Sequence, residues 1–314
     1  MFKSRPLRIA ALVVRILLGA LFIVSAIAKL VGIDDFEIYI FTYNVLPLTW
    51  SFLMARLVIV AEMIVGLLLI SNCFHRVVNW CATLMLLGFT VFLAVAALIG
   101  RTDSCHCMGA IMEINPLQSM IKNVVLLFLL LVAGGAKPFP WHPRRKVWVP
   151  AVLLPCIGVC VTVFILSAPD NWMFGPSEEV FNEERLDSAI GPEGDLHDLG
   201  LDNGRHVVAF LTPGCHFCKM ADEKLTHICR RNDLDSAAIV YLTPRIDSTI
   251  TPLTIDTSRF VRPCYMIDNM THAHITYGQR PLIFLMENGQ VVSTCHYRNI
   301  DEHQIVEFLQ QSSK

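Results

Sequence analysis

The chain has 314 residues, of which 54% are hydrophobic and 17% are charged, and its formal net charge is -2. Soluble domains carry about 25% charged residues, so this composition excludes a wholly soluble protein. The near-neutral charge, without a basic patch, predicts no nucleic-acid partner.

Five apolar stretches occupy the first half of the chain, and each is long enough to cross a bilayer, which takes roughly 20 residues. They lie at about 9–28, 52–71, 77–99, 117–135 and 147–167. We therefore expect an α-helical membrane bundle of five spans. Ser25-Ala26-Ile27-Ala28 resembles a signal-peptidase site, but the apolar segment around it is long and contains Arg15, so we expect no cleavage.

Charges between the spans predict the orientation. Lysine and arginine gather before the first span and between spans four and five, whereas the loops at about 32–51 and 100–116 are mostly acidic. Because positive loops stay in the cytoplasm, the N-terminus is expected inside. Both acidic loops, and everything after the fifth span, are then expected outside.

Several charged residues fall in or at the edge of the spans, where charge is costly. Arg15 and Glu62 lie deep, which favours a function or an ion pair between Glu62 and an arginine inside the bundle. Lys29, Arg56 and Lys122 lie nearer the outer face, so snorkelling to the headgroups and pairing both stay open.

The second half has the composition of a soluble domain. Residues 170–200 are hydrophilic and are expected to form a linker, with a short helix at about 178–190. From residue 201 onward, apolar runs and helix-like stretches alternate, which predicts a small α/β domain over 201–314. Its expected elements are a strand (206–211), a helix (216–230), a strand (237–242), an irregular region (244–276), two strands around Asn288-Gly289, and a last helix (301–312).

Cys215 and Cys218 follow the first of these strands and open the first of these helices. At a helix N-terminus the dipole and the free N–H groups favour the thiolate that attacks disulfides. His216, when charged, could stabilise that thiolate further. The spacing therefore predicts a redox-active pair, with a structural disulfide or a redox-inactive module as the alternatives.

Cys105 and Cys107 lie in the second acidic loop. A bridge between them would be strained and easily reduced, which suits a relay disulfide. Bridges to other cysteines, or metal binding with His106, stay open, although three ligands inside three residues cannot surround one ion. Eleven cysteines favour an oxidising compartment.

The remaining cysteines give weaker signals. Cys156 and Cys160 are one helical turn apart, too far for a disulfide on an intact helix, so we expect buried apolar thiols. Cys229 is expected in the core of the soluble domain. A pair between Cys264 and Cys295 is one possibility.

The soluble half resembles the thioredoxin superfamily. The resemblance rests on Val207-Val208-Ala209-Phe210-Leu211, on Cys215-His216-Phe217-Cys218-Lys219-Met220, and on Tyr277-Gly278-Gln279-Arg280-Pro281 followed by the hairpin. It implies that Cys215 attacks, that Cys218 resolves the mixed disulfide, and that Pro281 is a cis-proline facing them.

The membrane half resembles the DoxX/MauE group of four-helix membrane proteins. The resemblance is carried by Arg15-Ile16-Leu17-Leu18-Gly19, Ser25-Ala26-Ile27-Ala28-Lys29-Leu30, Leu46-Pro47, Glu62 with Gly66, and Asp103 to Gly109. It implies a four-helix domain over 1–136, and the fifth apolar stretch is then expected to form a separate transmembrane helix within 137–169. It also implies a membrane quinone, for which Arg15 and Glu62 are the candidate binding residues. The fused plan is similar to that of bacterial vitamin K epoxide reductase homologues.

These observations together predict a thiol–disulfide oxidoreductase of the bacterial inner membrane. Electrons would pass between Cys215/Cys218 and Cys105/Cys107, with exported cysteine-containing proteins at one end and a quinone at the other. The alternatives are a reductase of exported thiols, a non-enzymatic maturation scaffold, and thiosulfate oxidation with quinone. No metal is expected.

Overall fold

The computed structural model describes residues 5–43, 45–72, 74–98, 116–134, 145–167, 179–245, 254–256 and 260–310. The chain divides into two compact units. One unit contains Met1–Tyr39 and Phe52–Ala168, and the other contains Ile40–Ser51 and Pro169–Lys314.

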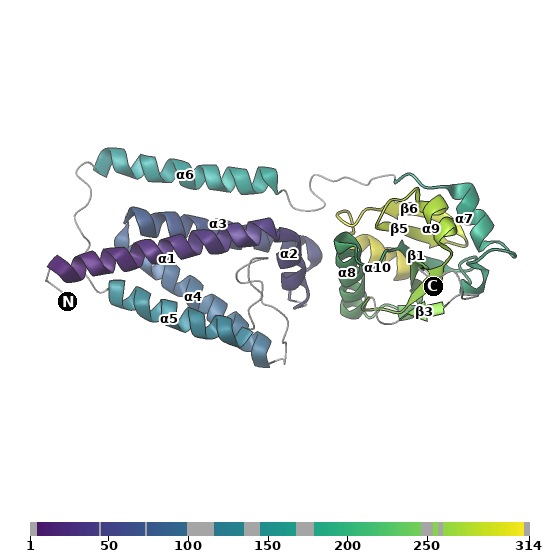
Figure 1. Ribbon diagram of the computed structural model, residues 1–314, viewed down its shortest axis with the longest axis horizontal. Coiled ribbons are helices and arrows are strands. Elements are labelled where there is room, and N and C mark those ends of the chain that lie inside the picture. Colours follow the sequence, from purple (N-terminus) through teal and green to yellow (C-terminus); the bar gives the residue numbers. More distant parts are fainter. Residues whose placement is uncertain are drawn as a thin grey trace. The chain divides into compact units, whose positions relative to one another are not determined.

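Long helices build the first unit. The helices in this part of the chain are α1 (Arg5–Val31), α2 (Ile33–Phe41), α3 (Leu48–Ser71), α4 (His75–Leu98), α5 (Pro116–Gly134) and α6 (Arg145–Leu166). In Figure 1, α1, α3, α4 and α5 run side by side as a bundle. Their shared core contains Leu18, Phe22, Leu69, Leu86 and Leu130. Many other apolar side chains of these helices stay exposed, as expected of a surface that faces lipid.

Two glycines let α1 and α3 approach each other closely. A Cβ atom added at Gly19 would lie 2.7 Å from the carbonyl oxygen of Gly66, and one added at Gly66 would lie 2.8 Å from the carbonyl oxygen of Gly19. Small residues at such crossings are typical of membrane helix pairs, because they allow backbone contact. This contact brings the polar side chains of α1 and α3 within reach of one another.

The expectation of five spans is wrong on length. Among the described residues, four helices are long and apolar enough to cross a membrane: Arg8–Val31, Leu48–Ser71, His75–Leu98 and Leu117–Gly134. The fifth candidate, α6, is helical, but its apolar part is Pro150–Leu166. At 1.5 Å per residue this part spans about 26 Å, which is shorter than the roughly 30 Å of a hydrocarbon core.

A six-stranded mixed sheet forms the centre of the second unit. Its order is β3 (Thr254–Asp256), β4 (Cys264–Ile267), β2 (Ile239–Pro244), β1 (Arg205–Phe210), β5 (Leu282–Glu287) and β6 (Gln290–Cys295). Strands β4, β2 and β1 run parallel, whereas β5 is antiparallel to β1 and β6 is antiparallel to β5. The hairpin predicted at Asn288-Gly289 is confirmed: both residues have positive φ, and Glu287 pairs with Gln290.

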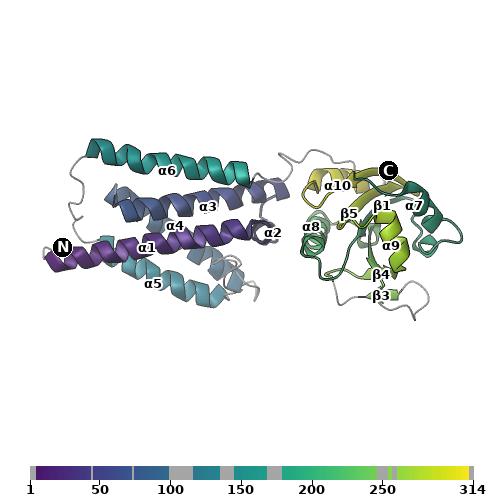
Figure 2. The same ribbon diagram turned by 45° about the horizontal axis from the view of Figure 1, so that its top comes forward.

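Helices cover both faces of the sheet (Figure 2). Side chains of β1 alternate between the two faces, as strand geometry requires. Val208 and Phe210 pack with α7 (Glu183–Ile190) and α9 (Asn269–Thr276) in one buried cluster. On the other face lie α8 (His216–Asn232) and α10 (Glu302–Gln310), where the hydroxyl of Tyr241 donates a hydrogen bond to the carbonyl of Asp222.

Two regions are more ordered than the sequence suggested. The stretch expected as a linker contributes Leu186, Ile190 and Leu196 to the core of the sheet domain, so the described domain begins before residue 201. The stretch expected as irregular contains β3, β4 and α9. Its strands are short: β4 pairs in parallel with β2, and β3 pairs with β4. Single-sequence patterns do not report such pairing.

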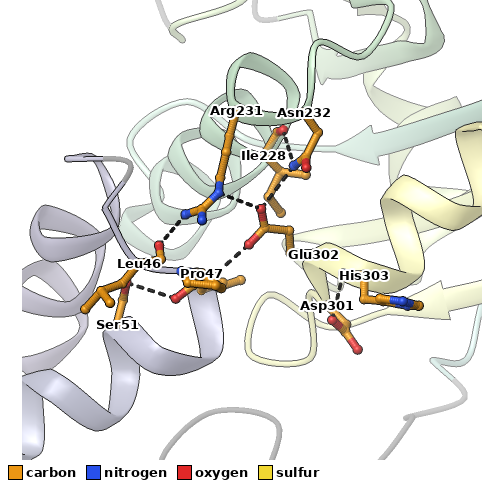
Figure 3. A network of polar contacts seen from close by, with 10 residues as sticks. Leu46, Pro47, Ser51, Ile228, Arg231, Asn232, Asp301, Glu302 and His303 are labelled. Atoms are coloured by element: carbon orange, nitrogen blue, oxygen red, sulfur yellow. Dashed lines mark hydrogen bonds and ion pairs between the residues drawn. The ribbon is translucent and has the colours of Figure 1, made fainter.

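The connection between α2 and α3 also belongs to the second unit (Figure 3). Arg231, near the end of α8, donates a hydrogen bond to the carbonyl of Leu46. Glu302, at the start of α10, accepts one from the N–H of Leu48 at 3.2 Å. Arg231 and Glu302 form an ion pair at 3.3 Å, and Asn232 donates to Glu302 at 3.0 Å. One carboxylate and one guanidinium thus hold the backbone of residues 46–48 against α8 and α10.

Candidate functional site

The candidate site is the dithiol at the start of α8. Strand β1 ends at Phe210, and a turn through Gly214, whose φ is +78°, leads into Cys215, the N-cap residue of the helix. Few residues other than glycine adopt this φ, so Gly214 is what lets the chain reverse directly before the cysteine. Cys215 is half-buried and Cys218 is fully buried, and both thiols are free.

The two thiols differ chemically because their surroundings differ. Burial, followed by a hydrogen bond with Cys215, raises the pKa of Cys218 to about 12. The N–H of Thr212 donates a hydrogen bond to the sulfur of Cys218 at 3.4 Å. This bond and the charge of Arg280 both lower the pKa of Cys218, but burial raises it by more. Cys215 is therefore the accessible thiol, and Cys218 is the shielded one held behind it.

The other residues predicted for this site are found as follows. His216 is exposed, and its ring lies edge-on to that of Phe217, with 5.8 Å between centroids. The peptide bond between Arg280 and Pro281 is cis, as the resemblance implied for Pro281. Arg280 itself is exposed, and its charge reaches Cys218.

A buried histidine near the site was not predicted. His272, in α9, is 1% exposed, and its ring lies edge-on to Phe210, the last residue of β1. Burial, followed by the charge of Arg280, lowers its pKa to about 4, so the ring is neutral at pH 7. Its Nε2 atom has no hydrogen-bond partner among the residues that the structure describes. No motif in the sequence marks this histidine, because it lies in the stretch expected as irregular.

An aromatic cluster beside the dithiol was also not predicted. Phe217, between the two cysteines, stacks on Tyr297 with 4.8 Å between ring centroids and 25° between ring planes. Tyr297 follows β6 and is far from Phe217 in sequence, so only the fold brings the two rings together.

The charged residues expected deep in the bundle, Arg15 and Glu62, do not contact each other. Glu62 pairs with Lys29, whose Nζ lies 2.8 and 2.9 Å from the two carboxylate oxygens and 2.7 Å from the hydroxyl of Ser25. Lys29 is buried, so it does not snorkel to the headgroups. Arg15 instead donates to Asn79 at 3.1 Å, which corrects the hypothesis of an ion pair between Glu62 and an arginine.

Arg56 is buried too, and it does not snorkel. It forms an ion pair with Glu37 and donates a hydrogen bond to the carbonyl of Ser167 at 2.6 Å. The buried cations Lys29 and Arg56 therefore have polar partners inside the bundle.

The remaining cysteines form no disulfide within the described residues. Cys105 and Cys107 lie outside the described residues. Cys156 is buried and Cys160 is half-buried, in agreement with unbridged apolar thiols on α6. Cys229, Cys264 and Cys295 are buried and form no disulfide with one another, so the possible bridge between the last two does not form. No three metal-ligating side chains gather within the described ranges.

Comparison with known proteins adds two similarities. Residues 7–137 match the family described as methylamine utilisation protein MauE, which covers less than half of this chain. The chain is also similar to Protein TlpB of Flavobacterium psychrophilum, with 25% identity over 284 residues that cover 74% of this chain and 77% of that protein. No solved structure matches the chain.

Proposed function

We propose that this membrane protein is a thiol–disulfide oxidoreductase whose sheet domain is a thioredoxin-like module. The observation that carries the proposal is the asymmetry of the dithiol: a half-buried Cys215 at a helix N-terminus, with Cys218 buried behind it. Thiol–disulfide exchange needs one sulfur that a partner can reach and a second sulfur that attacks only after the first has formed a mixed disulfide. This arrangement of two thiols meets both needs.

The proposed reaction moves two electrons by two displacements. The Cys215 thiolate attacks one sulfur of a partner disulfide, which forms a mixed disulfide and releases the other partner sulfur as a thiolate. Cys218 then loses its proton and attacks the sulfur of Cys215. This step closes the Cys215–Cys218 disulfide and releases the second partner thiolate. The partner is reduced to a dithiol, and the Cys215/Cys218 pair is oxidised to a disulfide.

The partner inside the chain is proposed to be the pair Cys105/Cys107. Residues 40–51, which connect the first two candidate spans, belong to the same compact unit as the sheet. Residues 99–115 lie between the third and fourth candidate spans in the sequence. On this proposal the four spans cross the bilayer in alternation, so this connection and the one between the first two spans lie on the same side of the membrane. Tethering then raises the effective concentration of one pair near the other to roughly millimolar.

The two ends of the electron path are proposed as follows. Exported cysteine-containing proteins would give electrons to the Cys215/Cys218 disulfide, and a membrane quinone would take them from the Cys105/Cys107 dithiol as two electrons and two protons. The location proposed is the bacterial inner membrane, with the dithiol domain outside the cytoplasm. The oxidising direction rests on the compartment alone.

A trapping experiment tests the internal relay. In a Cys218→Ser variant the second displacement cannot occur, so Cys215 should remain bridged to Cys105 or Cys107. The bridge is identified by mapping peptides from the detergent-purified full chain without reduction. Cys229→Ser in the same background is the matched control, because Cys229 is a buried thiol of the same helix. Recovery of bridges to foreign proteins alone would refute the relay.

Three further measurements test the direction of electron flow, the scaffold alternative and the quinone. A Cys215/Cys218 potential near -120 mV suits an oxidant, whereas one near -270 mV suits a reductase of exported thiols. Full activity in cells of the double variant Cys215→Ser/Cys218→Ser would favour a scaffold. Quinone reduction by the purified protein that depends on added dithiol would support the quinone as acceptor.

A further inference from the structure

The aromatic ring between the two cysteines is exposed and yet held in place. Phe217 is 41% exposed, although it lies one residue before the fully buried Cys218. Its ring stacks on Tyr297, which is 6% exposed. An exposed aromatic ring with a fixed orientation has already lost its rotational freedom, so a partner that binds it does not bear that entropy cost.

Three polar side chains hold Tyr297 in position. Lys224, itself buried, donates a hydrogen bond to the carbonyl of Tyr297 at 3.0 Å, and its Nζ lies 5.9 Å from the ring centroid. Arg298 donates to the hydroxyl of Tyr297 at 2.9 Å. The ring of His296 lies 4.4 Å from that of Tyr297. Lys224 thus supports Tyr297, and the ring of Tyr297 supports the exposed ring of Phe217 next to the dithiol.

The surroundings of this stack carry positive charge. Arg280 is exposed and acts on Cys218, and the guanidinium carbon of Arg298 lies 5.6 Å from the Tyr297 centroid. A surface with an aromatic centre and cations at its rim fits a peptide that has an apolar side chain and a carboxylate close to its cysteine.

One segment of this chain has that chemistry. The sequence Asp103-Ser104-Cys105-His106-Cys107-Met108 places a carboxylate two residues before one cysteine and a thioether one residue after the other. Thioether sulfur contacts aromatic rings favourably, and the aspartate is the complement of the arginines. We propose that Phe217, stacked on Tyr297, is the docking platform that receives segment 103–108 when its cysteines exchange with Cys215. This inference rests on the proposed relay.

The platform is tested by comparing two reactions of the same thiol. In the full chain with Cys218→Ser, one rate is the formation of the mixed disulfide with the segment. The other is the reaction of Cys215 with 5,5′-dithiobis(2-nitrobenzoate), a small disulfide that needs no platform. Phe217→Ala should slow the first reaction roughly tenfold, as expected for the loss of one aromatic contact of about 1.4 kcal/mol, and should change the second less than about twofold. Val292→Ala, which removes another exposed apolar side chain of this domain, should change neither.

A bridged synthetic peptide of residues 101–113, added to the full chain that lacks Cys105, Cys107 and Cys218, gives a second readout. Phe217→Ala should slow the reaction of the peptide with Cys215 by a similar factor. In the Phe217→Ala chain, a Met108→Ser substitution in the peptide should lower this rate little further. If Phe217→Ala slows the reactions of Cys215 with the segment and with the small disulfide equally, or slows neither, the platform is overturned while the relay stands. If the segment never bridges to Cys215 in the intact chain, the relay is wrong. If, in addition, Phe217→Ala does not slow the reaction with the peptide, the platform is overturned as well.

Discussion

The ion pair between Lys29 and Glu62 allows a quantitative prediction about the stability of the bundle. Both side chains are nearly inaccessible, and the lysine nitrogen contacts both carboxylate oxygens and the hydroxyl of Ser25. A Lys29→Met substitution leaves the carboxylate buried without its cation. Loss of one partner of a buried pair costs about 3–5 kcal/mol, so the free energy of unfolding should fall by that amount. Glu62→Met should cost a similar amount, since it leaves the ammonium without its carboxylate.

The double variant Lys29→Met/Glu62→Met separates pairing from packing. It removes both charges and fills the space with apolar side chains, so its free energy of unfolding should return to within about 1 kcal/mol of the parent. The assay is reversible unfolding in mixed micelles with increasing dodecyl sulfate, followed by circular dichroism. Arg76→Gln, at an exposed arginine of α4, is the control and should have little effect. Single variants that match the parent, or a double variant as unstable as the sum of the single ones, would refute the reasoning.

Three other predictions concern particular residues. Because the pKa of Cys218 is raised from 9.0 to about 12, the folded state holds this proton more tightly, so the stability it contributes is present below pH 9 and is lost as pH rises toward 12. Alkaline unfolding of Cys218→Ala should lack this component. The pKa of His272 is lowered from 6.5 to about 4, so its contribution is present above pH 6.5 and declines by about 3 kcal/mol as pH falls to 4. In an acid titration, the free energy of unfolding of His272→Leu should fall less steeply between pH 6.5 and 4 than that of the parent. Gly19→Ala should destabilise the bundle by about 1–3 kcal/mol because its Cβ would meet backbone, whereas Gly88→Ala, with nothing within 4 Å, should not; equal effects in detergent unfolding would contradict this.

Local patterns predicted much of the secondary structure. Four of the five expected spans are long apolar helices, and the expected hairpin at Asn288-Gly289 forms because both turn residues adopt positive φ. The expected strand before Cys215 and the helix after it are β1 and α8. The dithiol was predictable for the same reason, since its strand, turn and helix lie within a short stretch of chain.

Non-local pairing was harder to predict. The partner of Glu62 is Lys29 rather than Arg15, because the contact of Gly19 with Gly66 sets the register of α1 on α3. The strands β3 and β4 were not expected, since their local signals are weak and β4 is stabilised by its pairing with β2, which lies earlier in the chain.

By itself, the sequence determined where the chain is apolar enough to enter a membrane and where two thiols share the start of a helix. These are properties of neighbouring residues, so composition and spacing report them. Only the tertiary structure decided that Cys218 is buried behind Cys215, that Tyr297 supports Phe217, and that residues 46–48 pack on α8 and α10. Burial and partner choice depend on which distant side chains exclude water from a given atom, and no local pattern encodes that.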